Sequence, residues 1–311
     1  MNGWAKPLCR SRIGAAHRRR GLPCQDASLS ASLNSGDGLP VMVMAVADGH
    51  GHRLHWRSEV GSRLACQVAI DAVRAWVGSS AVAVGPQPPG DGLKVDDPAA
   101  SGLEVDDLEA GGLETGELED WHQWLAEELP ASICAGWLAA IREHWERNPE
   151  GEEVGVGFSA LPYGSTLGVV VMTPQWWGVT GLGDWDLVRV EADGEQTALI
   201  SEEAADVGPG EATLSLCLEG AERLFRRRAA LWERTEESEP VTLLLSSDGI
   251  RKSCGSDRDF LLLARYLAAL AGPGQPDAEP TELDTALDRV SREGSGDDVS
   301  VAIGRVLAAN P

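Results

Sequence analysis

Apolar residues recur along this chain with two different periods, and the change between them predicts the elements of the fold. Val41 to Ala47 is a short apolar run ending at Asp48-Gly49, which is typical of a buried strand that leads into a loop. Apolar positions from about 57 to 77 follow helical spacing, and so do those between Trp121 and Trp145. We therefore expect two long amphipathic helices. The second contains four tryptophans that fit either the core or a partner-binding face: Trp121, Trp124, Trp137 and Trp145.

The second half of the chain is rich in short strand-like runs. Three of them follow closely, at about 165–173, 176–182 and 185–190, and Asp193-Gly194 is a hairpin turn signal after the last. Strands this near in sequence leave no room for crossover helices, so we expect a largely antiparallel sheet. The pattern then predicts a helix with apolar Leu214, Leu216, Ala221 and Leu224, a strand at 241–247, helices near 257–271 and 281–292, and a closing strand at 298–306. The fold class is α+β.

The stretch from Gly78 to Asp120 differs in composition from both of its flanks. It is rich in Gly, Pro and Ala, and its eleven acidic residues and one Lys supply −10 of the net charge of −23. A Gly-Leu unit recurs every ten residues, at Gly92, Gly102 and Gly112, a period too short for a helical solenoid. We expect a disordered acidic insertion within one domain spanning residues 1–311. It is either a plain tether or a binding or regulatory segment.

The overall composition excludes several classes of protein. A net charge of −23 repels nucleic acid and anionic membranes at long range. No apolar run approaches the roughly 20 residues that span a bilayer, and the basic start lacks the apolar stretch of a secretory signal. We expect a cytoplasmic protein. Its six cysteines contain no C-x-x-C pair, so neither a disulfide framework nor a thiolate zinc site is expected.

Acidic residues stand at strand ends or in glycine-bounded turns at four places: Asp48, Asp184, Asp248 and the pair Asp297-Asp298. Carboxylates that converge at neighbouring strand ends repel one another, and a divalent cation is the least costly remedy. Oxygen ligands without cysteine favour Mg²⁺ or Mn²⁺ over zinc. The pattern predicts a divalent metal site built from these carboxylates.

Six short motifs occur in order along the chain. They are Cys24-Gln-Asp26-Ala, Ala47-Asp48-Gly49-His50-Gly51, Tyr163-Gly-Ser-Thr166-Leu, Gly183-Asp184, Leu245-Ser-Ser-Asp248-Gly249 and Gly294-Ser-Gly-Asp297-Asp298-Val-Ser300. Over about residues 10–76 and 160–306 the chain resembles a bacterial metal-dependent serine/threonine protein phosphatase of the 2C (PPM) family. The resemblance implies an α-β-β-α sandwich of two mainly antiparallel sheets flanked by helices. It also implies a phosphorylated protein substrate and a cognate Ser/Thr kinase as partners. The charge and the short apolar runs already argue against nucleic acid and membrane as partners.

The resemblance assigns metal ligands residue by residue. Asp48 would bridge two Mn²⁺ or Mg²⁺ ions, the carbonyl of Gly49 would bind one of them, and Asp248 and Asp297 would complete the other. Asp184 matches the position that holds a third, looser ion in some bacterial relatives. Two bridged ions would make a shared water the nucleophile against phosphorus.

Other roles follow from the same resemblance. Asp26 would hold metal-bound waters, and Asp298 stands where the family often has Asn. His50 either protonates the leaving seryl or threonyl oxygen or has a structural role beside the metals.

Two departures from the family pattern affect the site. Gly21 stands where the family has a phosphate-holding Arg, and the nearest cations are His17, Arg18, Arg19 and Arg20. We expect phosphate binding by His17, Arg18 and Arg20. The usual Gly-Asp-Ser-Arg has become Gly183-Asp184-Trp185-Asp186, which is expected to place a bulky aromatic ring beside the third-metal position.

Two other classes of protein remain as alternatives. His50, His52 and His55 have the H-x-H-x-x-H spacing of metallo-β-lactamase-like dizinc hydrolases, but Leu54 stands where that motif needs Asp. The second alternative is a catalytically impaired phosphatase-fold module that binds phosphoproteins or a regulator. The missing Arg favours it, and the complete set of core acids opposes it.

Overall fold

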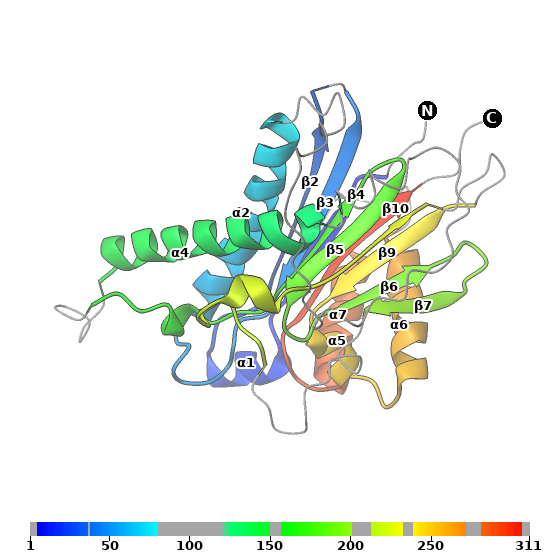
Figure 1. The fold of residues 1–311 in the computed structure, drawn as a ribbon. Helices are drawn as coiled ribbons and strands as arrows, with labels where there is room; N and C mark the ends of the chain where they lie inside the picture. The colour runs from blue at the N-terminus through cyan, green and yellow to red at the C-terminus, as the bar shows by residue number, and fades with distance from the viewer. Residues whose placement is uncertain are drawn as a thin grey trace, which may run out of the picture.

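Two five-stranded antiparallel sheets form the centre of the computed structural model, which describes residues 5–36, 38–79, 121, 123–149, 157–200, 213–232, 239–271 and 281–306 (Figure 1). Sheet I contains, in spatial order, β1 (Leu8–Arg12), β10 (Val299–Val306), β9 (Val241–Ser246), β6 (Asp186–Val190) and β7 (Gln196–Ile200). Sheet II contains β2 (Ala27–Asn34), β3 (Pro40–Ala47), β4 (Leu167–Met172), β5 (Trp176–Leu182) and β8 (Arg226–Leu231).

Helices cover the outer face of each sheet (Figure 1). Sheet II is covered by α2 (Ser58–Ser79), a π-helical turn η1 (Trp124–Glu128) and α4 (Leu129–Arg147). Sheet I is covered by α5 (Asp248–Lys252), α6 (Asp257–Leu270) and α7 (Glu282–Glu293), and the short α1 (Ala15–Arg20) connects β1 to β2. This arrangement confirms the expected α-β-β-α sandwich.

The apolar run of β3 lies between two separate cores. Val41, Val43 and Ala45 pack against the helices of sheet II, whereas Met42 and Met44 pack against sheet I in the layer between the sheets. Successive side chains of a strand point to opposite faces, so a strand covered on both faces must be apolar at every position. The continuous run ending at Ala47 is therefore the sequence of a central strand.

Most predicted elements are present. The helices expected at 57–77 and from Trp121 to Trp145 correspond to α2 and to η1 with α4. The three successive strand runs are β4, β5 and β6, and Gly194 turns the β6–β7 hairpin with φ of +89°. The strand near 241, both later helices and the closing strand are β9, α6, α7 and β10.

The tryptophans of the second long helix belong to the core. Trp124 and Trp137 are buried, and the half-buried Trp121 and Trp145 pack against the same cluster. The indole of Trp137 also donates to the carbonyl of Gly61 at 3.0 Å, which joins α4 to α2. These contacts favour the core interpretation of the tryptophan pattern over a partner-binding face.

One predicted element is wrong, and several were not predicted. The helix expected around Leu214 to Leu224 consists of turns with a short 3-10 helix, η5 (Ala221–Leu224). Leu216 and Ala221 are buried although the segment is a turn, whereas Leu224 is exposed. The Ser215 hydroxyl accepts a hydrogen bond from the Ser165 backbone at 3.1 Å, which holds the segment against another loop. The pattern also gave no sign of β1, β2 or β8, whose half-buried residues mix polar and apolar types.

The acidic insertion lies almost entirely outside the described residues. Helix α2 continues to Ser79, and the expectations of disorder and of a regulatory role concern residues 80–120, which are not among those described.

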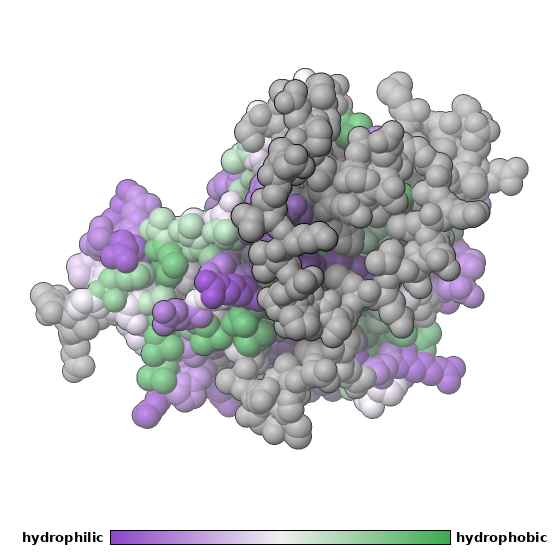
Figure 2. Space-filling model, in the orientation of Figure 1, coloured by the Kyte–Doolittle hydropathy of each residue, from purple (hydrophilic) through white to green (hydrophobic). Residues whose placement is uncertain are grey.

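On the face drawn in Figure 2, hydrophobic and hydrophilic residues are interleaved over the part of the surface where α4 lies. Among the described residues, no helix has the length and apolar character needed to cross a membrane.

Candidate active site

The predicted acidic residues come from segments that meet at one end of the two stacked sheets. Asp48 directly follows β3 of sheet II, and Asp248 begins α5 immediately after β9 of sheet I. Asp297 precedes β10, the neighbour of β9. Asp184 lies in the turn by which the chain passes from β5 in sheet II to β6 in sheet I. The antiparallel order of both sheets therefore brings four distant segments to the same end of the sandwich.

The electrostatics of these groups confirm that they are neighbours. Burial raises the pKa of Asp48 well above its usual range, and the charges of Asp26, Asp184 and Asp297 raise it further. Burial likewise raises the pKa of Asp248, with Asp48 and Asp184 adding to the effect. Asp26 also has a raised pKa, caused first by burial and then opposed by a hydrogen bond from Ser247. We call these five residues, Asp26, Asp48, Asp184, Asp248 and Asp297, the acidic cluster.

The acidic cluster combines buried and accessible groups. Asp26 and Asp248 are buried, while Asp48, Asp184 and Asp297 are half-buried. Asp26 and Asp48 act on each other's pKa, and Asp184 raises the pKa of Asp248. The cluster is thus enclosed on the side of Asp26 and Asp248 and open to solvent on the other side, as a site for a large substrate requires.

A divalent cation fits the chemistry of the cluster. Asp26 Oδ1 and Asp248 Oδ1 are buried and have no hydrogen-bond partner among the described residues. Buried carboxylate oxygens without partners are costly, and several repelling carboxylates make them costlier. An oxygen-coordinated cation such as Mg²⁺ or Mn²⁺ would remove both costs. Within the described part of the chain, no three His, Cys, Asp or Glu side chains already converge as a complete metal-binding group, and one carboxyl of the cluster, that of Asp248, pairs with Lys252.

The loop that carries Asp48 is held by the third sequence motif. The backbone of Thr166 donates to the carbonyl of Asp48 at 2.8 Å, and its hydroxyl accepts from the backbone of Asp48 at 3.0 Å. The next residue must be glycine, because a Cβ on Gly49 would lie 2.7 Å from the carbonyl oxygens of Gln25 and Ser58. The loops that carry the Gly-Ser-Thr and Asp-Gly-His motifs are therefore joined to each other by hydrogen bonds.

His50 lies beside the acidic cluster with one free ring nitrogen. Its Nε2 is buried and has no hydrogen-bond partner among the described residues, and its ring meets that of His55 edge-on at a centroid distance of 4.9 Å. Burial lowers the pKa of His50 to about 4, with His55 and Lys252 acting in the same direction and Asp184 against it. The ring is therefore neutral near pH 7. A neutral imidazole facing the cluster can donate or accept a proton at Nε2.

Asp298 has a different role from Asp297. Its carboxylate accepts hydrogen bonds from the backbone of Gly14 at 2.5 Å and of Gln25 at 2.6 Å, and it lies 2.9 Å from Nδ1 of His17. These three contacts fix the segment from β1 to β2, which carries Asp26. Asp298 thus holds Asp26 in place through the backbone of the preceding residue, Gln25.

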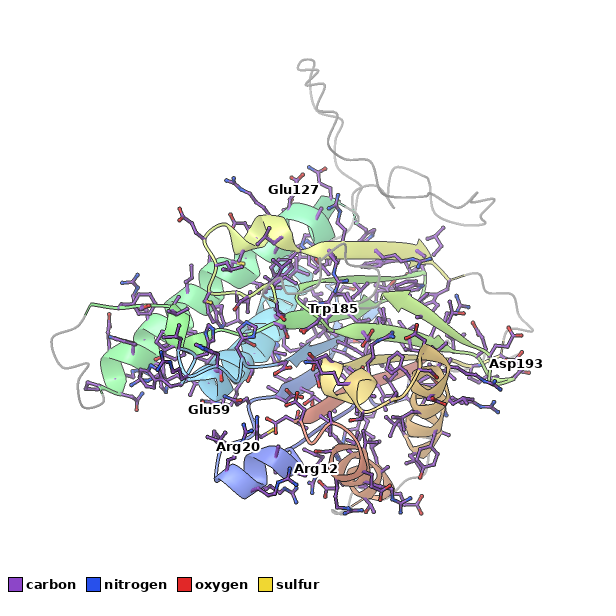
Figure 3. The ribbon with its side chains drawn as sticks, turned by 90° about the horizontal axis from the view of Figure 1, so that it is seen from below. Arg12, Arg20, Glu59, Glu127, Trp185 and Asp193 are labelled. Carbon is purple, nitrogen blue, oxygen red and sulfur yellow. The ribbon has the colours of Figure 1, made fainter. Side chains whose placement is uncertain are left out.

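The structure engages two of the expected phosphate ligands elsewhere. His17 is buried against Asp298, and Arg18 pairs with Asp288 on α7 at 3.0 Å. Both side chains are thus paired with carboxylates, and their binding of phosphate stays a prediction. Arg20 is exposed at the end of α1 (Figure 3).

Trp185 does not lie beside the third-metal position, contrary to the expectation from its sequence neighbour Asp184. Its side chain is buried in the layer between the sheets, at the centre of Figure 3. Two glycines make room for the ring: a Cβ on Gly168 or Gly181 would lie 2.8 Å from it. The next residue, Asp186, is fully buried and forms an ion pair with Arg251 at 3.0 Å. Trp185 and Asp186, which stand where the family has Ser and Arg, therefore contribute to the packing between the sheets and to an ion pair with α5.

Lys252 was missed by the sequence analysis. Its ammonium group forms an ion pair with Asp248 across one turn of α5. The signal was available, because a Lys four residues after an Asp that begins a helix reaches back over the first turn.

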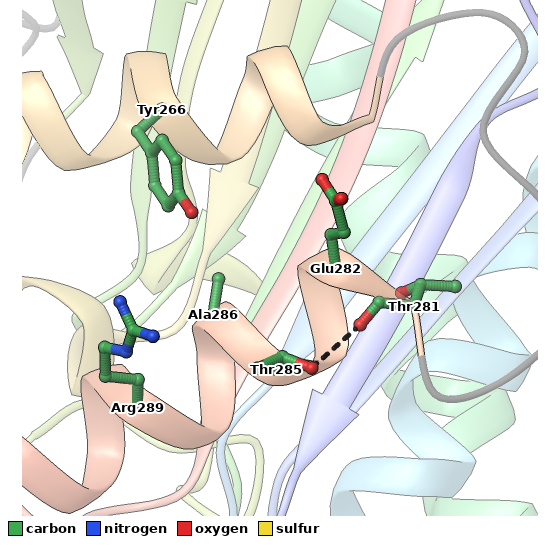
Figure 4. Close-up of a pocket in the computed structure, with 6 residues that line it drawn as sticks. All are labelled: Tyr266, Thr281, Glu282, Thr285, Ala286 and Arg289. Atoms are coloured by element: carbon green, nitrogen blue, oxygen red, sulfur yellow. Dashed lines mark hydrogen bonds between the residues drawn. The ribbon is translucent and has the colours of Figure 1, made fainter.

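A separate hollow of about 380 Å³ lies between α6 and α7 (Figure 4). Six residues line it, namely Tyr266, Thr281, Glu282, Thr285, Ala286 and Arg289. None of them belongs to the acidic cluster. Thr281 caps α7 in a capping box with Asp284, so its hydroxyl is committed to the helix end.

An α-β-β-α sandwich with a carboxylate cluster at one end of its stacked sheets agrees with the resemblance carried by the six sequence motifs. A family model described as Protein phosphatase 2C matches residues 13–288. The chain therefore belongs to the protein phosphatase 2C family of protein serine/threonine phosphatases. No curated protein matches the sequence.

Solved structures share this fold at low sequence identity. The catalytic domain of the serine/threonine protein phosphatase PstP in complex with two manganese ions is 18% identical, with a TM-score of 0.51, and the match covers 98% of this chain and 99% of that chain. A bacterial serine phosphatase is 13% identical with a TM-score of 0.53, covering 98% and 99%. Stp1 from Staphylococcus aureus is 13% identical with a TM-score of 0.51, covering 98% and 96%.

Proposed function

We propose that this protein hydrolyses phosphoserine and phosphothreonine in proteins with two Mn²⁺ or Mg²⁺ ions. The observation that carries the proposal is the convergence of five carboxyl groups, two of which leave a buried oxygen without a partner among the described residues. Membership of the family gives the substrate class, and the manganese ions of the PstP complex support the choice of metal.

Four groups would hold the ions. The carboxylate of Asp48 would lie between them, the carbonyl of Gly49 would serve one, and Asp248 and Asp297 would serve the other. Bound ions would lower the pKa of a water molecule, so that it becomes the nucleophile, and would neutralise the oxygens of the phosphoryl group.

Asp26 would orient the attacking water. The Ser247 hydroxyl donates to its Oδ2 at 2.7 Å, and Asp298 fixes the backbone of the preceding Gln25. Asp26 Oδ1 is then the oxygen left to accept a hydrogen bond from water. Oδ2 of Asp26 thus holds the side chain in place, and Oδ1 is available to bind the water.

His50 would handle the proton of the leaving group. The ring is neutral at rest because burial and His55 lower its pKa to about 4. A dianionic phosphoryl group beside Nε2 would favour the protonated ring. The proton on Nε2 would then pass to the departing seryl or threonyl oxygen.

A second candidate function is the binding of phosphoproteins or of a regulator without turnover. The observation that favours it is the engagement of His17 by Asp298 and of Arg18 by Asp288, which leaves the phosphate without two of its expected ligands. Binding without turnover needs the same fold but no activated water.

A single assay separates the two functions. The purified full chain is incubated with a phosphothreonyl peptide in Mn²⁺ and in EDTA, and released phosphate and peptide affinity are both measured. Hydrolysis that requires Mn²⁺ and is lost in Asp48→Asn supports the phosphatase. Binding of the peptide without phosphate release supports the second function, and release that persists in EDTA contradicts the proposed use of metal.

A further inference from the structure

Lys252 lies on the exposed side of the acidic cluster, at the end of a very short helix. Helix α5 begins at Asp248 and ends at Lys252, so the spacing of four residues returns the lysine side chain over the first turn. Its ammonium group pairs with Asp248, whose side chain is only 2% exposed. Lysine is rare in this chain, which has only three: Lys6, Lys94 and Lys252. One of the three thus lies among the candidate metal ligands.

The ammonium group is stabilised by more than one carboxylate. Burial alone lowers the pKa of Lys252, but Asp248, then Asp184 and Asp48, raise it above the ordinary range. Lys252 also contributes to the lowered pKa of His50. The charges of Asp248 and Asp184 both act on Lys252, and Asp184 is the position at which the sequence resemblance placed a third ion.

The formal charges of the cluster balance with two ions and one lysine. With all five carboxyl groups ionised the cluster would carry −5, and two divalent cations together with the Lys252 ammonium group would carry +5. A third divalent cation would leave a surplus of +2. Unbalanced charge in a partly buried site is unfavourable, whichever its sign.

We propose that Lys252 takes the place of a third divalent cation, so that this chain binds two ions and holds Asp184 and Asp248 by an ammonium group instead. The inference rests on the proposed two-metal function and adds to it a residue that sets the number of ions. Lys252 acts here as a positioning residue, because its contacts are with Asp248 and its neighbours and not with reacting atoms.

The test counts Mn²⁺ ions bound to the EDTA-stripped full chain by isothermal titration calorimetry and by electron paramagnetic resonance of the free ion. We expect two ions in the wild type and in Lys252→Arg, which keeps the charge. We expect a third in Lys252→Gln, or in Lys252→Met if the first variant folds poorly. The exposed Lys6→Gln is the matched control and keeps two.

The third Kd of Lys252→Gln should be at least about tenfold tighter than any third binding in the wild type, because a unit charge acting on a divalent ion across roughly 6 Å is worth about that factor even at the dielectric constant of water. Three ions in the wild type, or the same number and Kd in Lys252→Gln, would overturn the inference while leaving the metal-dependent function intact. A raised KM for phosphopeptide with unchanged Mn²⁺ binding would also overturn it and would assign Lys252 to the phosphate. Binding of no Mn²⁺ by the wild type would refute the proposed function and the inference together.

Discussion

Nδ1 of His17 lies 2.9 Å from Oδ2 of Asp298, and this buried contact ties α1 to the loop that also carries Asp297. The same carboxylate accepts hydrogen bonds from Gly14 and Gln25. A single side chain therefore fixes the segment leading to Asp26, although Asp26 and Asp298 are far apart in sequence.

Removal of this carboxylate should weaken both stability and activity. Asp298→Ala leaves two buried backbone N–H groups without an acceptor, and each is expected to cost about 1–3 kcal/mol. Asp298→Asn keeps one acceptor oxygen and should lose roughly half as much. The free energy of unfolding in urea measures the effect, and the phosphatase rate reports whether Asp26 has moved. Glu219→Ala, at an exposed position, is the control and should change neither. Equal stability of Asp298→Ala and the wild type would mean that the contacts of Asp298 do not hold the segment.

The ligands of the cluster should differ in importance for turnover. Asp48→Asn removes the group proposed to serve both ions and should nearly abolish phosphate release in Mn²⁺. Asp184→Asn should leave a measurable fraction of the rate, since Asp184 is not among the four groups proposed to hold the two ions. Steady-state rates on a phosphothreonyl peptide at saturating Mn²⁺ make the comparison. Similar losses in the two variants would contradict this order.

Metal removal should reveal the repulsion within the cluster. Without ions, the carboxylates of the cluster destabilise the fold, so Asp48→Asn should melt at a higher temperature than the wild type in EDTA. Mn²⁺ should raise the melting temperature of the wild type by mass action and have little effect on the variant. Differential scanning calorimetry in EDTA and in Mn²⁺ gives both values. A lower melting temperature of the variant in EDTA would indicate that Asp48 is needed for packing.

The raised pKa values predict the pH dependence of the metal-free protein. A carboxyl whose folded pKa is raised contributes stability that is fully present below its unfolded value of about 3.9 and is lost as pH rises toward the folded pKa. Asp48 and its neighbours are raised in this way. Between pH 5 and pH 8 in EDTA, the wild type should therefore lose stability relative to Asp48→Asn. Unfolding curves of both proteins across this range test the difference, in which the titrations of groups distant from the cluster cancel. Parallel curves would mean that Asp48 carries no raised pKa.

The packing of Trp185 predicts a strong coupling with Gly168. Trp185→Ala should cost about 3–5 kcal/mol through the cavity it leaves between the sheets. Gly168→Ala should also destabilise, because its new Cβ would lie 2.8 Å from the ring of Trp185. In the double variant the clash with the ring is absent. Its loss of unfolding free energy should therefore be smaller than the sum of the losses in the two single variants. Urea unfolding of the four proteins measures the coupling, with Leu262→Ala, 48% exposed, as a control. If the two losses were strictly additive, the ring of Trp185 would not lie against Gly168.

Much of the sandwich follows from the sequence alone. The β3 run is apolar at every position from Val41 because both of its faces are covered, and the amphipathic α2 and α4 need only their own periodicity to be recognised. The acids of the site could be named in advance because each lies next to a glycine or a strand end within its own short motif. Such local signals are readable because the residues that generate them are neighbours in the chain.

Other features were decided only by the tertiary structure. The sequence places Trp185 next to Asp184, but alternation along the start of β6 sends its ring into the layer between the sheets. His17 and Arg18 looked available for phosphate until the fold brought Asp298 and Asp288 against them. The surroundings of Lys252 were also decided by the fold, since Asp184 and Asp48, from distant segments, act on its pKa together with Asp248. The partner of a charged or aromatic side chain depends on contacts between distant segments, and no local pattern records those contacts.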